Sequence, residues 1–227
     1  MIPFRDHNRS RRFPILTTLL VTINGIVWLY MWMLSATGGL QAFAERWAVT
    51  PYNLTHSPSL RDLLTIVTAM FMHGSWAHII GNMLYLWIFG DNIEDVLGRP
   101  LYLLFYFVGG LAATALQVAV APNTRVPNLG ASGAIAAVLG GYLVLFPQAR
   151  IDTLVFLGYF IRIIALPALY VLGFWFVIQL FSGLGTLGMS AAGGGVAYFA
   201  HVGGFAAGLA MMALYKAATG GPRRERA

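Results

Sequence analysis

The 227-residue sequence contains no cysteine, which excludes a disulfide framework, a thiolate metal site and a cysteine nucleophile. Charge is also scarce: 10% of the residues are Asp, Glu, Lys or Arg, whereas a soluble globular chain carries roughly 25%. Hydrophobic residues make up 58% of the chain, so too few polar groups are present to cover a soluble surface. These shortages exclude a cytosolic globular domain, a disordered chain and a coiled coil. With 26 glycines and 10 prolines, the composition is typical of a polytopic membrane protein.

Several familiar site chemistries are missing as well. The zinc-binding sequence H-E-x-x-H does not occur, and His73 and His78 are five residues apart, a spacing that makes them poor joint ligands on one helix. No pair of carboxylates lies in the middle of the apolar segments, as an aspartyl protease needs, and Gly38 and Gly39 form no phosphate-binding loop. We therefore expect neither a metal nor a cofactor.

Six segments are long and apolar enough to cross a hydrocarbon core of ~30 Å, which takes about 20 residues of helix. They are Pro14–Leu34, Ser75–Val96, Pro100–Val120, Leu129–Phe146, Phe160–Phe181 and Val196–Tyr215. We predict an all-α polytopic membrane protein, a bundle of six transmembrane helices over residues 14–216 between tails at 1–13 and 217–227. The first loop, 35–74, is external in this prediction. The apolar stretch Thr153–Tyr159 is too short to span, and we interpret it as interfacial.

The formal net charge is +6, and the basic residues are distributed unevenly over the predicted topology. Eleven of the 14 Lys and Arg residues lie in the two tails or in the connections on the same side. The other side carries only Arg46, Arg61 and Arg125. The positive-inside rule therefore predicts that both termini are cytoplasmic. Because this asymmetry accounts for the positive charge, we do not expect the protein to bind nucleic acid.

Polar residues inside spans indicate function, and four of them carry our prediction. They are His78 and Asn82 in the second span, Ser132 in the fourth and His201 in the sixth. These three spans run in the same direction, and each residue lies within the first turns of its span. At 1.5 Å rise per residue, all four lie roughly 5–10 Å below the external surface. Their shared depth predicts one common site.

These residue types fit nucleophilic catalysis. Ser132 is a weak nucleophile unless a base removes its proton, and His201 is the only histidine of the last three spans. His78 and Asn82 are four residues apart on one helix face, so with the Ser132 backbone N–H they can form an oxyanion hole. The alternatives are structural: a serine bonded back to a helix carbonyl and an asparagine that joins two helices.

Two further patterns bear on this site. Gly130 and Gly133 flank the serine, and Gly204 shares a helix face with His201, so the two helices can approach closely. The carboxylates after the second span lie at the opposite end of the bundle, which favours a Ser–His dyad over a triad. The first-loop acids Glu45 and Asp62 remain open as a third member.

The sequence resembles the rhomboid family of intramembrane serine proteases. The matching segments are His73-Gly-Ser-Trp-Ala-His78-Ile-Ile-Gly-Asn82, Gly130-Ala-Ser132-Gly133-Ala134, Ala200-His201-Val-Gly-Gly204, Glu94 with Gly98-Arg99, and, more weakly, Glu45-Arg46-Trp47. The resemblance implies the six-span bacterial form in the inner membrane, acting on transmembrane protein substrates in the lipid bilayer. It also implies Ser132 as nucleophile, His201 as base, His78 and Asn82 in the oxyanion hole and a structural role for His73.

One position departs from the family pattern. Many members carry an aromatic residue four positions after the serine, where it packs against the catalytic imidazole, and this chain has Ala136 there. Another group must then orient His201. The rival function is a non-catalytic rhomboid-like scaffold that binds membrane clients, but inactive relatives lose the serine or the histidine, and both are present here.

The resemblance also implies a lateral gate between the second and fifth spans. The bulky residues that would seal it are Met83, Leu86, Trp87, Phe174, Trp175 and Phe181. The glycine-rich, uncharged stretch 182–195 leads into the sixth span. We interpret it as a mobile cap over the site or, alternatively, as a tight surface connection.

Overall fold

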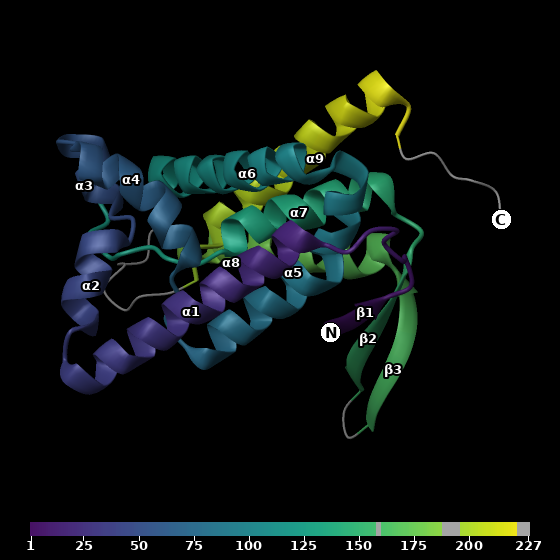
Figure 1. Cartoon of the computed structure of the whole chain (residues 1–227), viewed down its shortest axis with the longest axis horizontal. Helices are drawn as coiled ribbons and strands as arrows, with labels where there is room; N and C mark the ends of the chain where they lie inside the picture. Colours follow the sequence, from purple (N-terminus) through teal and green to yellow (C-terminus); the bar gives the residue numbers. More distant parts are fainter. Residues whose placement is uncertain (158–159, 188–195, 222–227) are drawn as a thin grey trace.

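The computed structural model describes residues 1–157, 160–187 and 196–221 of the chain. Long helices form a bundle with short helices at one end and a small sheet at the other (Figure 1). The long helices are α1 (Ile15–Thr37), α5 (Trp76–Leu97), α6 (Arg99–Val120), α7 (Ser132–Leu145), α8 (Ala168–Thr186) and α9 (Tyr198–Thr219). All the predicted spans except the fifth coincide with one of these helices to within a few residues.

Four of these helices, α1, α6, α8 and α9, are long and apolar enough to cross a membrane by length and composition. A fifth candidate is the bent pair Leu60–Phe71 and Trp76–Leu97, whose halves meet at 80°. Helix α7 has only 14 residues and falls short of that test. The described residues therefore contain four or five apolar spans and one short apolar helix.

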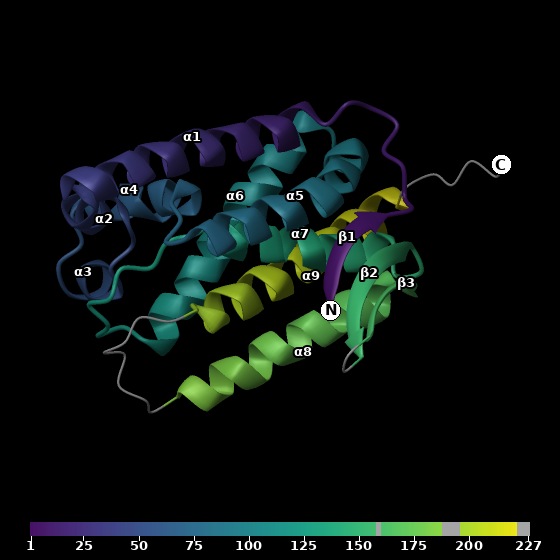
Figure 2. The ribbon, with the colours of Figure 1, turned by 90° about the horizontal axis from the view of Figure 1, so that it is seen from below.

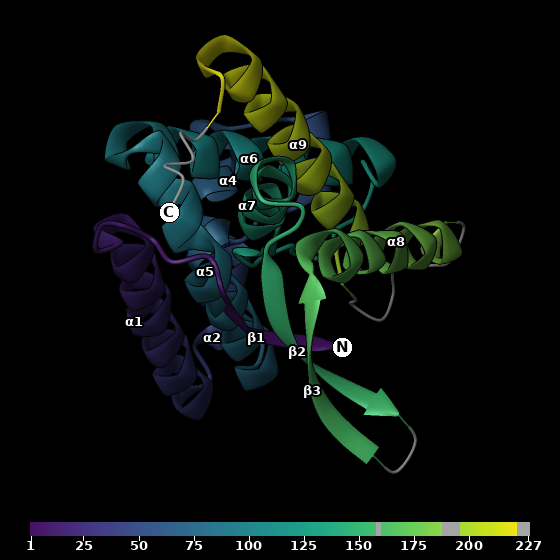
Figure 3. The ribbon, with the colours of Figure 1, turned by 90° about the vertical axis from the view of Figure 1, so that its right-hand side faces the viewer.

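Helix α7 lies at the centre of the bundle, against α5, α6 and α9 (Figure 3). Its residues from Gly133 to Tyr142 are all buried, and most of them are Gly, Ala or aliphatic. Small residues let the neighbouring backbones come close: a Cβ atom at Gly109 would collide with Ala137, and one at Gly208 would collide with the carbonyl group of Ala137. Because other helices surround it, α7 needs no lipid-facing surface of its own.

The sheet overturns part of the prediction. Strands β1 (Ile2–Asp6), β2 (Arg150–Leu157) and β3 (Phe160–Pro167) pair antiparallel in that order, and the β2–β3 hairpin extends away from the bundle (Figure 3). The all-α assignment is therefore wrong, and so is the start of the fifth span, because α8 begins only at Ala168. The stretch interpreted as interfacial, Thr153–Tyr159, lies in β2 up to Leu157, and its last two residues lie outside the described residues.

The physical reason for this error is that a short apolar run does not distinguish helix from strand. In β2 the β-branched residues Ile151, Thr153 and Val155 alternate along the chain, a pattern that favours an extended strand. The pairing of Ile151 with Asp6 and of Thr153 with Pro3 then completes the sheet with a segment from the opposite end of the sequence.

The first loop folds into short helices at the other end of the bundle. They are α2 (Leu40–Trp47), α3 (Pro51–His56), α4 (Leu60–Thr68) and a 3₁₀ turn, η1 (Ala69–Phe71). Ser59 caps α4 by accepting a hydrogen bond from the Asp62 N–H, and the Asp62 carboxylate accepts one from the Ser59 N–H in return. Gly130 donates its N–H to the Ala69 carbonyl at 2.9 Å, which ties this loop to the start of α7.

The start of α1 is capped by a residue of another helix. The first N–H groups of a helix lack partners within it. Here the Glu94 carboxylate of α5 accepts from Leu16 N at 2.9 Å, from Thr17 N at 2.8 Å and from the Thr17 hydroxyl at 2.9 Å. Helices α1 and α5 run side by side (Figure 2). The Glu94 carboxylate lies at the positive end of the α1 dipole and fixes the register of α1 against α5.

Candidate active site

The structure brings Ser132 and His201 into hydrogen-bond contact. The distance between Ser132 Oγ and His201 Nε2 is 2.8 Å. Ser132 is the first residue of α7, and His201 lies in the first turn of α9 with 9% of its surface exposed. The two residues are 69 positions apart in sequence, so only the packing of α7 on α9 creates the pair.

Glycine allows this close packing. A Cβ atom at Gly204 would collide with the carbonyl oxygen of Gly133, and a Cβ at Gly133 would lie 2.6 Å from the Cβ of Ala113. Any larger residue at either position would push α9 or α6 away from α7. The close approach of the helices at Gly133 and Gly204 sets the separation of the serine and the imidazole.

His78 faces the same point from α5. Gly130 has a φ of 134°, a conformation that favours glycine. A Cβ there would lie 2.8 Å from His78 Nε2 and 3.6 Å from Ser132 Oγ. The His78 N–H donates to the Ser75 hydroxyl, which caps α5 and fixes the turn that carries the imidazole. Gly130 thus separates two polar groups that face each other.

Asn82 is held differently. Its Nδ2 donates a hydrogen bond to His73 Nε2 at 2.9 Å, and both side chains are buried. The rings of His73 and His78 are in edge contact, with centroids 5.0 Å apart. Among the described residues, the hydrogen bond of Asn82 goes to His73 and not to Ser132. His73 therefore positions the Asn82 side chain.

Helix α8 supplies two residues that contact His201: Gln179, which the sequence did not single out, and Trp175, which was predicted to belong to the gate. Gln179 Oε1 lies 2.7 Å from His201 Nδ1, and the Trp175 ring lies 5.7 Å from the imidazole at 36°. Trp175 also contacts the ring of Phe205. Because Gln179 and Trp175 are four residues apart, both project from one face of α8 onto His201. They orient the His201 imidazole, which the small side chain of the fully buried Ala136 cannot do.

The sequence contains a feature that points to Gln179 as a functional residue. It is a polar residue within the predicted fifth span, and the rule that polar residues inside spans indicate function applies to glutamine as well as histidine. Gln117 in α6 is a second case, since its Oε1 accepts a hydrogen bond from Ala200 N at 3.2 Å and holds the start of α9.

The loop carboxylates do not reach the histidine. Glu45 accepts a hydrogen bond from Gln41 at 2.9 Å, and Asp62 is engaged with Ser59. Within the described parts of the chain no carboxylate bonds to His201, and no group of three or more His, Cys, Asp or Glu could hold a metal ion. The neutral Gln179 occupies the place of a third member.

The predicted gate contacts differ from those observed. Trp87, Phe174 and Phe181 expose 52%, 50% and 68% of their surfaces, so they do not seal a closed seam. Trp175 packs on His201 instead. Of the predicted cap, residues up to Thr186 continue α8, and residues 188–195 lie outside the described residues.

Fold and site together define a class: a multi-span membrane protein with a buried Ser–His pair at one end of its bundle. Residues 60–218 match the Rhomboid domain, and because this match covers more than half of the sequence, the chain belongs to the rhomboid family of intramembrane serine proteases.

Three curated relatives illustrate the similarity. The chain is 31% identical over 126 residues to "Rhomboid protein 1, mitochondrial" of Saccharomyces cerevisiae, covering 53% of this chain and 36% of the relative. It is 33% identical over 102 residues to "Presenilin-associated rhomboid-like protein A, mitochondrial" of Danio rerio, covering 44% and 27%. It is 29% identical over 160 residues to "RHOMBOID-like protein 12, mitochondrial" of Arabidopsis thaliana, covering 63% and 44%. The chain thus spans less than half the length of these relatives.

Proposed function

We propose that this chain is an intramembrane serine endopeptidase that hydrolyses peptide bonds in or near transmembrane segments of membrane-protein substrates. The observation that carries the proposal is the 2.8 Å contact between Ser132 Oγ and His201 Nε2. Membership of the rhomboid family supports it independently.

The proposed reaction begins with proton transfer. The Gln179 oxygen accepts the Nδ1–H of His201, which leaves Nε2 unprotonated and able to accept the Ser132 hydroxyl proton. Ser132 Oγ then attacks the scissile carbonyl carbon, and the imidazolium passes its proton to the leaving amine. In the second half, Nε2 takes a proton from a water molecule, which attacks the carbonyl carbon of the acyl-enzyme. The imidazolium then returns the proton to Ser132 Oγ as the acyl group leaves.

The oxyanion of each tetrahedral intermediate needs donors. The Ser132 backbone N–H at the start of α7 and the His78 side chain opposite Gly130 are the proposed donors. We include Asn82 as a third donor through the second hydrogen of its amide, because His73 holds the first. Gly130 would then leave room for the oxyanion between His78 and Ser132.

The proposed topology has six spans in a membrane domain over residues 14–216, with tails at 1–13 and 217–227 in the cytoplasm. In it α7 is the fourth span; at 1.5 Å per residue its 14 residues cover roughly 21 Å, and its neighbours shield it from lipid. Charge asymmetry supports the orientation. The bacterial form and a bacterial plasma membrane belong to this proposal, whereas the relatives named above carry mitochondrial names. Membrane fractionation and terminal tags accessible from one side would test it.

The function is tested by cleavage of a transmembrane substrate by the purified protein. Ser132→Ala and His201→Ala should each remove essentially all cleavage, and the double variant should be no worse, because the two residues act as a unit. A serine-reactive fluorophosphonate should label the unmodified chain and not Ser132→Ala. A non-catalytic scaffold would instead bind clients equally well with or without Ser132, and substantial cleavage by either folded single variant would refute the dyad.

A further inference from the structure

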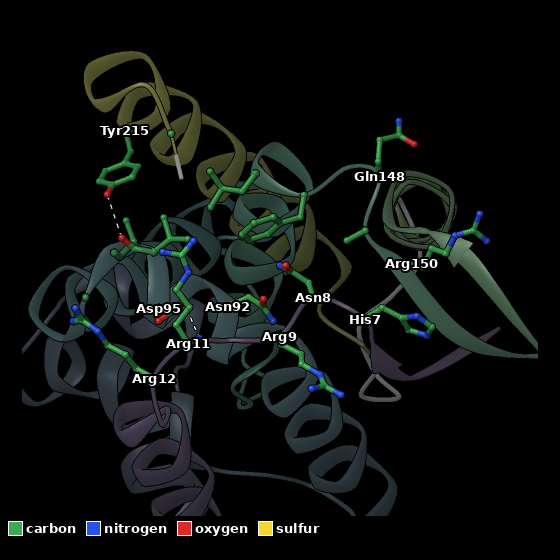
Figure 4. Close-up of a pocket in the computed structure, with 17 residues that line it drawn as sticks. His7, Asn8, Arg9, Arg11, Arg12, Asn92, Asp95, Gln148, Arg150 and Tyr215 are labelled. Atoms are coloured by element: carbon green, nitrogen blue, oxygen red, sulfur yellow. Dashed lines mark hydrogen bonds between the residues drawn. The ribbon is translucent and has the colours of Figure 1, made fainter. Parts of the chain in front are cut away.

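A pocket opens at the end of the bundle away from Ser132 (Figure 4). Its volume is about 800 Å³. Its floor is made by the last turns of three helices: Val96 and Leu97 of α5, Leu145 of α7 with the following Phe146, and Tyr215 of α9. Since Ser132 begins α7 and Leu145 ends it, the two sites lie about one helix length apart, roughly 20 Å.

One wall is the segment that joins β1 to α1, and the fold holds this segment in place. The Asp6 carboxylate accepts hydrogen bonds from the Tyr142 hydroxyl at 2.7 Å and from Asn92 Nδ2 at 3.0 Å. Further along, the His7 N–H donates to the Arg150 carbonyl at 2.9 Å and the Arg11 N–H donates to Asp95 Oδ2 at 3.1 Å. The segment is therefore a fixed wall rather than a loose tail.

This wall makes the pocket strongly basic. Arg9, Arg11 and Arg12 line it from the segment and Arg150 from the start of β2, and Figure 4 shows these side chains spread around it. Among the described residues, Asp95 is the one carboxylate in the lining. Within the described residues, Arg9, Arg12 and Arg150 form no salt bridge with a carboxylate, and Asp152 pairs with His7.

Two exposed apolar side chains lie beside the pocket. Phe13, directly after Arg12, exposes 68% of its surface, and Ile15 at the start of α1 exposes 43%. A basic pocket at the ends of membrane-spanning helices, beside exposed apolar side chains, lies where phospholipid headgroups meet acyl chains. A soluble anion would gain no binding free energy from these apolar side chains.

We propose that this pocket binds the phosphate of an anionic phospholipid, with the guanidinium groups on the phosphate oxygens and the acyl chains along the surface near Phe13. Guanidinium groups bind phosphate through paired hydrogen bonds, and the open floor accommodates the glycerol part of the headgroup. The inference rests on the membrane topology and is independent of proteolysis.

The test measures lipid binding directly. Purified protein in dodecyl maltoside is titrated with phosphatidylglycerol, with phosphatidylcholine or with inorganic phosphate, and thermal stability and lipid retention in native mass spectrometry are recorded. A ligand that binds only the folded state raises the melting temperature as its concentration exceeds the dissociation constant. Phosphatidylglycerol should stabilise the protein and be retained, phosphatidylcholine should do neither, and high salt should weaken the effect.

Charge-matched variants decide whether the pocket is responsible. The triple change Arg9→Gln, Arg12→Gln and Arg150→Gln should lower the affinity for phosphatidylglycerol roughly tenfold or more. The control changes Arg5→Gln, Arg61→Gln and Arg162→Gln, which remove the same charge from exposed sites outside the pocket, should leave it unchanged. If the first triple variant does not fold, Arg150→Gln alone should still lower the affinity severalfold.

Three results would overturn the proposal. They are equal binding of phosphatidylglycerol and phosphatidylcholine, equal loss of affinity in both triple variants, and stabilisation by inorganic phosphate without lipid retention, which would indicate a site for free phosphate. Loss of proteolysis alone bears only on the proposed function.

Discussion

Gln179 Oε1 lies 2.7 Å from His201 Nδ1, on the side of the imidazole opposite Ser132. The hydrogen bond holds the ring between α7 and α8, and because an amide oxygen only accepts, it favours the tautomer with the proton on Nδ1 and an unprotonated Nε2 towards the serine hydroxyl. A neutral amide thus takes the place that a carboxylate occupies in a Ser–His–Asp triad.

If Gln179 positions His201, its replacement should change catalysis more than stability. Gln179→Leu keeps the approximate side-chain size and loses the hydrogen bond, and we expect cleavage to fall about tenfold, as for loss of one buried hydrogen bond. Gln179→Glu should restore activity and move the acid limb of the pH–rate profile to higher pH, because a carboxylate stabilises the protonated ring. The profile is measured on a transmembrane substrate. Identical profiles for the Glu variant and the unmodified protein would show that Gln179 only fills space.

The two side chains proposed for the oxyanion hole should differ in their effects. His78→Ala should lower the rate by on the order of 10²–10³ with little change in melting temperature. Asn82→Ala should lower the rate and also the stability, by about 1–3 kcal/mol, because it leaves the buried His73 without its partner. Rates and melting temperatures of both variants are compared. If both rates were normal, the two residues would serve only to join helices.

The crossing of α7 and α9 predicts a steric effect. Gly204→Ala places a methyl group against the Gly133 carbonyl, and we expect a loss of stability of about 1–3 kcal/mol with a separation of Ser132 from His201 that lowers cleavage. Gly173→Ala in α8 is the matched control, because a Cβ there would have no neighbour within 4 Å. Equal stability of the two variants, measured by thermal unfolding in detergent, would contradict this packing.

The attachment of β1 predicts a pH dependence. Burial raises the pKa of Asp6 from 3.8 to about 6, with the nearby Asp91 acting in the same direction. Since the folded-state pKa lies above the unfolded value, the stabilising contribution of Asp6 is complete below about pH 3.8 and is lost as the pH rises through about 6.

Asp6→Asn should remove this dependence. We expect the melting temperature of the unmodified protein to fall, relative to that of Asp6→Asn, as the pH is raised from 5 to 7, across the Asp6 pKa of about 6. The difference between the two proteins isolates Asp6 from other titrating groups. A difference that does not change with pH would show that the Asp6 carboxyl is not desolvated.

The sequence by itself determined the long helices and the serine–histidine pair. Twenty apolar residues in a row dictate a spanning helix because the lipid core leaves no other way to satisfy the backbone. The depth of Ser132, His78 and His201 follows from counting residues along such helices. The glycines at positions 133 and 204 likewise indicate a close crossing of the two helices.

Only the tertiary structure decided the rest, because it depends on partners that are distant in sequence. The apolar run 150–167 becomes a hairpin through pairing with Ile2–Asp6. Trp175, which was predicted to belong to the gate, packs on His201 instead, because packing sets the rotation of α8 about its axis. Asn82 pairs with His73 rather than with the serine. The arginines of the N-terminal segment, which the sequence presented as a topological signal, are brought together over the ends of α5, α7 and α9 because Asp6, His7 and Arg11 each bond to a different distant element.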